Sequence, residues 1–126
     1  MNYKRSPWGS VQHATTIMRG VSFISTSSHG GVRIRRELAM ENLPMKDILA
    51  NDHIGIFLDH DFAWFEEDCA CNLVFAFWQK AAEKQFALMK KWGDKMTEDE
   101  FCELVTREIH QWYPEFDGLI NKPILP

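Results

Sequence analysis

The chain has little of the features that mark several special classes of protein. It holds 3 cysteines, 5 prolines and 7 glycines in 126 residues. An odd and small number of cysteines excludes a disulfide framework, so we expect buried free thiols and a reducing compartment. The modest proline and glycine content excludes collagen-like and low-complexity chains.

Long apolar runs are missing as well. The longest run, Leu73 to Trp78, has six residues, whereas a membrane span needs about 20. The first residues, Met1 to Pro7, carry no apolar stretch behind them, so no secretory signal is expected. We therefore expect one domain over residues 1–126, located in the cytoplasm and without a membrane partner.

The net charge of −4 conceals an uneven distribution along the chain. Residues 1–46 carry seven basic side chains against two acidic ones, and residues 47–126 carry seven against sixteen. Either the fold has two faces of opposite sign, or its two halves neutralise each other where they pack.

The first third of the chain predicts a β-meander over residues 11–36. Residues 32–35 alternate apolar and basic side chains, which places Arg33 and Arg35 together on the solvent face of a strand. Gly30 and Gly31 predict a turn, because glycine adopts positive φ at little steric cost. Residues 54–58 are expected to form either a fourth strand or a buried connecting segment.

The rest of the chain predicts helices. Pro44 suits the start of a short helix over residues 44–51. Residues 66–92 contain no proline or glycine and predict one long central helix, while the pair Thr97 and Glu100 is typical of a capping box that begins a helix over residues 97–113. Residues 114–126 are predicted to form an extended tail. The expected fold is α+β, with a three- or four-stranded antiparallel sheet packed against C-terminal helices.

Two polar segments supply the candidate ligand-binding residues. The turn at Gly30 and Gly31, together with Arg33 after it, could hold an anion such as phosphate. Residues 66–69, which we call the acidic segment, could hold Mg²⁺ or supply a general base if both segments line one pocket. The candidates are Ser28, His29, Gly30, Gly31 and Arg33 in the first segment, and Glu66, Glu67, Asp68 and Cys69 in the second.

A structural interpretation competes with each of these. The three acids would suit the first turn of the long helix, where the helix dipole favours negative charge, and a two-glycine turn needs no ligand. A catalytic triad at Ser27 and His29 would also need a carboxylate that orients the histidine, and the sequence does not indicate one. Cys69 and Cys71 are two residues apart, so on a helix they would point in opposite directions and could not share a zinc ion. We therefore predict no catalytic residue, no metal and no cofactor.

Basic and aromatic side chains form a candidate interaction surface. Arg33 and Arg35 on the sheet could contact phosphates of nucleic acid, but the acidic pI of about 5.7 does not favour that partner. Trp8, Trp112 and Tyr113 lie beside residues that break helices and strands, where large side chains are often only partly covered.

Three segments resemble an uncharacterised family of phage- and plasmid-borne proteins. The segments are Pro7-Trp8-Gly9, Ser25 to Gly31 and Trp64 to Cys69. The second segment corresponds to a Ser-Thr-x-Ser-His-Gly-Gly motif of that family, and the third corresponds to a Trp-Tyr-Glu-Glu-Asp-Cys motif. The match covers roughly residues 6–78, and Phe65 replaces the expected tyrosine. The resemblance implies an origin in a bacteriophage or mobile element, and hence the cytoplasm of a bacterial host.

These observations lead to a ranked set of functional expectations. The first is a non-enzymatic protein that binds a host protein or complex, for example as an anti-defence inhibitor similar to anti-CRISPR proteins. The second is a small enzyme or a nucleotide- or metal-binding protein that uses the His-Gly-Gly turn and the Glu-Glu-Asp-Cys segment. The third is a DNA-binding regulator that uses the basic face of the sheet.

Overall fold

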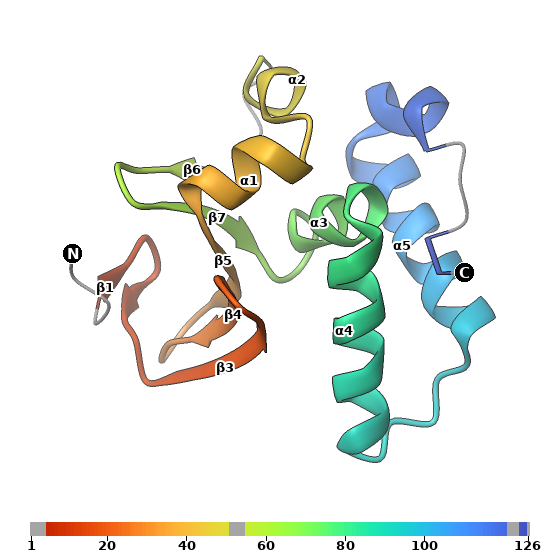
Figure 1. Ribbon diagram of the computed structural model, residues 1–126, viewed down its shortest axis with the longest axis horizontal. Coiled ribbons are helices and arrows are strands. Elements are labelled where there is room, and N and C mark those ends of the chain that lie inside the picture. The colour runs from red at the N-terminus through yellow and green to blue at the C-terminus, as the bar shows by residue number, and fades with distance from the viewer. Residues whose placement is uncertain (1–4, 51–54, 121–123, 126) are drawn as a thin grey trace.

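The predicted meander forms the first part of a five-stranded antiparallel sheet. The computed structural model describes residues 5–50, 55–120 and 124–125. Strands β3 (His13–Met18), β4 (Val21–Ser25) and β5 (Gly30–Arg35) pair in sequence order, β7 (Phe62–Glu66) pairs with β5, and β6 (Ile56–Leu58) lies at the edge beside β7. The sheet lies to one side of helices α3, α4 and α5 (Figure 1). The predicted α+β class is confirmed, and the optional fourth strand corresponds to β6.

The pleat of the strands gives the sheet two different faces. Val32 pairs with Phe65, and both side chains are buried on the face that packs against the helices. Arg33 pairs with Trp64 on the opposite face, which we call the outer face. The predicted alternation of apolar and basic residues in β5 therefore holds.

Two short helices lie between β5 and β6 along the chain. Helix α1 (Arg36–Asn42) follows β5 directly, and α2 (Met45–Leu49) begins one residue after Pro44. Their buried residues, Ala39, Met45 and Ile48, extend the main core at one end of the sheet. The short helix predicted over residues 44–51 is present in the described part of that range, residues 44–50.

The predicted long helix over residues 66–92 is wrong. Residues up to Glu66 continue strand β7, residues 67–70 form a turn, and two helices follow, α3 (Cys71–Phe77) and α4 (Gln79–Lys91). Trp78 separates them with an extended backbone (φ −123°, ψ 90°). The absence of proline and glycine did not reveal this bend, because burial of Trp78 in the core competes with helix propensity.

The last helix agrees with the prediction, and the tail does not. Helix α5 (Glu98–Trp112) begins with a complete capping box between Thr97 and Glu100. The tail is not extended throughout: a 3₁₀ helix, η1 (Pro114–Leu119), follows α5, and Phe116 is buried with its ring 5.6 Å from that of Phe77. Burial of apolar side chains thus folds this segment back onto the core.

A small hairpin covers the outer face of the sheet. Strands β1 (Arg5–Ser6) and β2 (Gly9–Ser10) pair antiparallel, ahead of the predicted meander. Trp8, in the hairpin turn, packs with Val11 against a second small core formed by Ile24, Phe62 and Trp64. Within the described ranges, no helix has the length and apolar character that crossing a membrane requires.

Candidate functional site

The three sequence segments that carry the family resemblance meet around the glycine pair. The amide of Glu67 donates to the carbonyl oxygen of Gly30 at 3.0 Å. A Cβ atom at Gly30 would lie 3.1 Å from a Glu67 carboxylate oxygen, and one at Gly31 would lie 2.6 Å from the Trp8 indole and closer still to the carbonyl oxygen of Phe65. The glycines lie in β5 without positive φ, so they are needed for space and not for a turn conformation.

The turn before the glycines is organised by Thr26. Its hydroxyl accepts from the amide of His29 at 3.1 Å and donates to the carbonyl oxygen of the same residue at 2.6 Å. Ser28 and His29, both proposed from the sequence as ligand-binding residues, are exposed at the tip of this turn. Thr26 therefore closes the turn and leaves the two neighbouring side chains directed at solvent.

The acidic segment does not begin a helix, which corrects the helix-dipole interpretation. Glu66 ends β7, and Glu67 and Asp68 are exposed in the turn before α3. The Cys71 thiol donates to the carbonyl oxygen of Glu67 at 3.0 Å, and the Asn72 side-chain amide donates to the carbonyl oxygen of Cys69 at 3.2 Å. Hydrogen bonds from α3 thus shape this turn.

Tyr113 is a buried part of the same junction, so its assignment to an exposed surface is wrong. Its side chain is 2% exposed, and its hydroxyl donates to the sulfur of Cys69 at 3.5 Å. Burial, together with the contact to Cys69, raises the pKa of Tyr113 well above its ordinary value. Burial also raises the pKa of the Cys71 thiol, to about 12. Both groups stay protonated at neutral pH.

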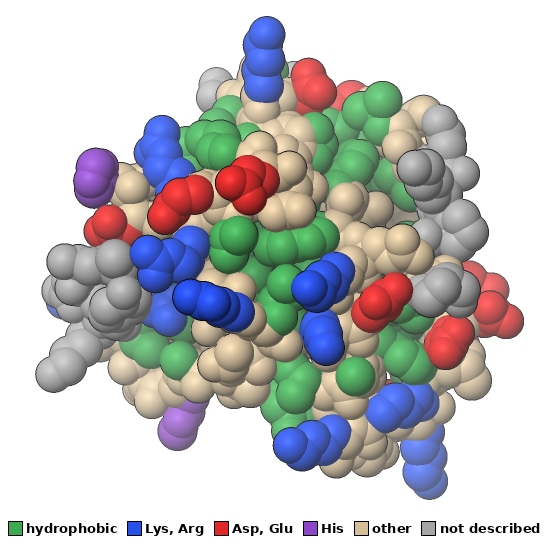
Figure 2. Space-filling model, in the orientation of Figure 1, with side chains coloured by type: hydrophobic (Ala, Val, Ile, Leu, Met, Phe, Trp, Pro, Cys, Tyr) green, Lys and Arg blue, Asp and Glu red, His purple; other side chains and the backbone are tan. Residues whose placement is uncertain are grey.

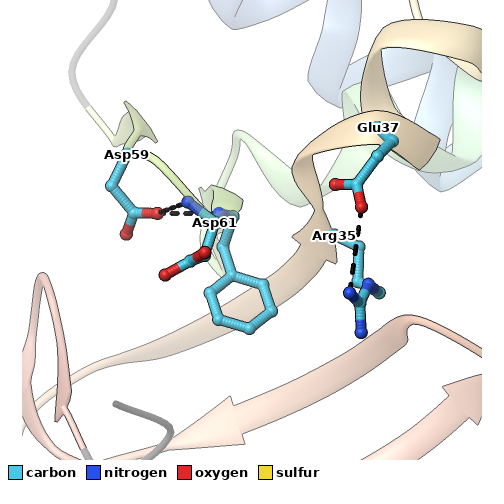
Figure 3. A network of polar contacts seen from close by, with 5 residues as sticks. Arg35, Glu37, Asp59 and Asp61 are labelled. Atoms are coloured by element: carbon cyan, nitrogen blue, oxygen red, sulfur yellow. Dashed lines mark hydrogen bonds and ion pairs between the residues drawn. The ribbon is translucent and has the colours of Figure 1, made fainter. Parts of the chain in front are cut away.

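The two arginines of β5 have different surroundings. The guanidinium carbon of Arg33 lies 4.8 Å from the centre of the Phe62 ring and 6.0 Å from that of Trp64, so Arg33 helps to cover the small outer core. Arg35 is exposed and lies 3.8 Å from the carboxylate of Glu37 (Figure 3). The sheet therefore presents Arg35, and not both side chains, as an exposed base, and Glu37 lies beside it.

Asp59 organises the turn between β6 and β7, a role that sequence reasoning left unassigned. One carboxylate oxygen accepts from the amides of Asp61 and Phe62 at 2.8 and 2.7 Å, and the other accepts from the Trp64 indole at 2.7 Å. Figure 3 shows this carboxylate turned toward the backbone of the strand that follows. Burial alone would raise the pKa of Asp59, but these hydrogen bonds outweigh it and lower the pKa below 3.8.

An open cleft of about 410 Å³ lies where the main core meets α3, α4 and α5; we call it the acidic cleft. Most of its lining surface is apolar. Two exposed carboxylates from the acidic segment and a third carboxylate from α5 also line it. Within the described residues, no Lys or Arg lines it. The apolar residues are Phe23, Val32, Phe75, Met89, Phe101 and Leu104, and the polar ones are Glu67, Asp68, Cys71, Asn72, Gln85 and Glu108.

Only two of the ligand-binding residues predicted from the sequence line the acidic cleft. Glu67 and Asp68 line it, whereas Ser28, His29 and the glycine pair do not. Gln85, Met89 and Glu108 were missed because they come from α4 and α5, which the sequence does not place beside the acidic segment. One feature of the sequence could have indicated the contribution of α5: Leu104 and Glu108 are four residues apart, so an apolar and an acidic side chain share one face of that helix.

Basic side chains gather elsewhere on the surface. Lys80, Lys84 and Lys91 are exposed on α4, and their spacing places them on the side of that helix opposite to Gln85 and Met89. Figure 2 shows Lys and Arg side chains over the sheet and α4. The uneven charge of the sequence therefore does not map simply onto two halves, because α4 brings bases of the second part beside those of the first.

A family model for a domain of unknown function, DUF7007, matches residues 1–124. The chain belongs to this family. No curated protein and no solved structure matches it. Membership of an uncharacterised family, predicted from the sequence resemblance, is thereby confirmed, and the phage or plasmid origin stays a prediction.

In this DUF7007 chain the motif residues and the cleft are linked through the turn at residues 67–70. Within the described residues, no cluster of three His, Cys, Asp or Glu side chains is arranged to hold a metal ion. The motif glycines are packed against Trp8 and Glu67, and the turn that follows β7 directs its carboxylates to the acidic cleft. The motifs thus shape the packing of the sheet on one side and part of the acidic cleft on the other.

Proposed function

We propose that this DUF7007 protein is a non-catalytic binding protein that acts by protein–protein contact, with the acidic cleft as its docking site. The observation that carries the proposal is the composition of the cleft, an apolar wall edged by Glu67, Asp68 and Glu108. Concave apolar sites with a few convergent polar groups are the usual form of a binding pocket. Three carboxylates without a basic partner in the lining select a cationic ligand.

The surroundings of the motif residues favour binding over chemistry. The space beside Gly30 and Gly31 that a phosphate would need is filled by Glu67 and Trp8. The buried thiol of Cys71, two residues after the candidate Cys69, has a pKa of about 12 and already donates a hydrogen bond to a carbonyl oxygen. A protonated, hydrogen-bonded thiol is a poor nucleophile.

The occupant of the cleft is a segment of a partner protein with an apolar side chain flanked by Arg or Lys. The apolar side chain would bury surface against Phe75, Phe101 and Leu104. The cationic groups would face the carboxylates, which speeds association and selects the orientation of the partner. A host target and an anti-defence role are the specific form of this proposal that the resemblance to phage- and plasmid-borne proteins supports.

The test places a photo-crosslinking amino acid in the cleft and, as a control, outside it. Gln85 lines the cleft, and Lys80 is exposed on the opposite side of the same helix. In bacterial cells, the proposal expects one defined protein to crosslink from position 85 and not from position 80. Crosslinking should fall at higher salt, since the carboxylates attract a cationic segment.

Charge reversal provides the second arm of the test. Glu108→Lys should reduce crosslinking from position 85 by roughly tenfold or more, whereas Glu83→Lys, on an exposed position of α4 outside the cleft, should leave it unchanged. Equal crosslinking from positions 80 and 85, or equal effects of the two reversals, contradicts the proposal.

A further inference from the structure

Glu108 is paired with a tryptophan at the edge of the acidic cleft. The indole Nε1 of Trp112 donates to a carboxylate oxygen of Glu108 at 3.1 Å. Leu104, Glu108 and Trp112 follow each other at intervals of four on α5, so they form one stripe along the helix. Trp112 therefore lies one helical turn beyond the cleft residue Glu108.

Trp112 and Trp92 are the two largely exposed tryptophans among the described residues. Trp112 is 53% exposed, and the hydrogen bond to Glu108 holds the edge of its ring. Immobilising the ring in the free protein lowers the entropic cost of binding against its face. Exposed tryptophans are also enriched among the residues that dominate interface energies.

We propose that Trp112 and Glu108 together receive an arginine side chain of the partner, an inference that rests on the proposed function of the acidic cleft. The guanidinium stacks on the exposed face of the Trp112 indole, where the ring quadrupole attracts a cation. Its N–H groups donate to the Glu108 carboxylate, of which only Oε2 accepts a hydrogen bond from the described residues. Glu67 and Asp68 add to the negative potential of the same cleft.

The geometry favours arginine over lysine. A planar guanidinium stacks on an indole and donates to a carboxylate at the same time, because its five N–H groups lie in the plane of the group. The ammonium group of lysine is compact and strongly hydrated, so it loses more hydration for the same contact. The adjoining apolar wall, which includes Leu104, accommodates an apolar neighbour of that arginine.

The experiment uses short peptides as defined probes on the isotope-labelled full chain. Acetyl-Leu-Arg-Phe-amide is titrated while the indole N–H signals are followed by NMR, with the Trp112 signal assigned from Trp112→Phe. The expected result is a saturable shift of that signal. The citrulline peptide, which has nearly the same shape but no charge, should bind roughly threefold to tenfold more weakly, and the lysine peptide should fall between the two.

Variants separate recognition of the arginine from a general effect of charge. Glu108→Gln removes the charge but keeps an oxygen acceptor for the indole, and it should weaken the arginine peptide by roughly threefold to tenfold. Glu103→Gln, on an exposed position of the same helix outside the cleft, should have no effect. Equal binding of the arginine and citrulline peptides, equal effects of the two variants, or no binding overturns the inference.

The inference can fail while the proposed function survives. If a partner crosslinks from position 85 but Trp112→Leu leaves its capture unchanged, the cleft is a docking site without an arginine receptor at Trp112. If crosslinking from position 85 also fails to depend on Glu108, the proposed function fails with it.

Discussion

The indole of Trp8 lies over Gly31, so close that a single methyl group at that position would meet it at 2.6 Å. Trp8 also packs edge-to-face on Trp64, with ring centres 5.7 Å apart. The hairpin of β1 and β2, the glycine pair of β5 and strand β7 are thereby joined on the outer face of the sheet. This contact brings three segments that are separated in the sequence together in space.

The contact predicts that Gly31→Ala destabilises the protein strongly. The added methyl group meets the indole of Trp8 and the backbone oxygen of Phe65, which cannot move without shifting β7. We expect the free energy of unfolding to fall by roughly 3 kcal/mol, as measured by urea denaturation. Gly118→Ala is the matched control, since nothing lies within 4 Å of its Cβ position, and a similar loss in both variants would contradict the explanation.

Trp8 and Trp64 should respond differently to replacement by phenylalanine. The indole Nε1 of Trp64 donates to Asp59, whereas that of Trp8 is buried and has no hydrogen-bond partner among the described residues. Trp64→Phe should therefore cost about 2 kcal/mol more than Trp8→Phe, because it leaves a carboxylate oxygen without its donor while the other change removes an unsatisfied group. Thermal and urea unfolding of both variants measure the difference, and equal losses would refute it.

Asp59 predicts a specific dependence of stability on pH. Its pKa is lower in the folded chain than its ordinary value of 3.8. The ionised carboxylate therefore stabilises the fold above that value, and this contribution is lost as the pH falls through the lower folded-state pKa. Asp59→Asn should lose stability at pH 7 and show a smaller further loss between pH 5 and pH 3 than the unchanged chain, as followed by urea unfolding at each pH. Parallel pH profiles for the two proteins would be inconsistent with this role.

The thiols should differ in reactivity. Burial raises the pKa of Cys71 to about 12, while Cys69 and Cys102 are partly exposed. Because the thiolate is the reactive form, we expect iodoacetamide at pH 8 to modify Cys71 at least about tenfold more slowly than the faster of the other two. Peptide mapping by mass spectrometry measures each rate, and labelling in denaturant, where the rates should become similar, is the control. Preferential labelling of Cys71 in the folded chain would exclude the described environment.

Local sequence signals predicted the elements that local forces determine. The capping pair Thr97 and Glu100 located the start of α5, because the hydrogen bonds that begin a helix lie within four residues. The alternation in residues 32–35 predicted the two faces of β5 for the same reason. In the candidate site, only Glu67 and Asp68 were identified from the sequence as polar residues near a ligand.

The remaining errors come from contacts between distant residues. The exposed position expected for Tyr113 is wrong because its hydroxyl reaches Cys69, 44 residues earlier in the chain. The bend at Trp78 lets α3 pack against α5 while α4 packs against β3. No local pattern contains either relationship.

By itself, the amino-acid sequence determined the α+β class, the meander, the capped last helix and the membership of an uncharacterised family, since each depends on neighbouring residues or on a linear motif. Only the tertiary structure decided that the glycine pair makes room for Trp8, and that Glu67, Asp68 and Glu108 line one cleft. The physical reason is that packing and electrostatic potential depend on distances in space, and the bend at Trp78 and the return of the chain after α5 set those distances.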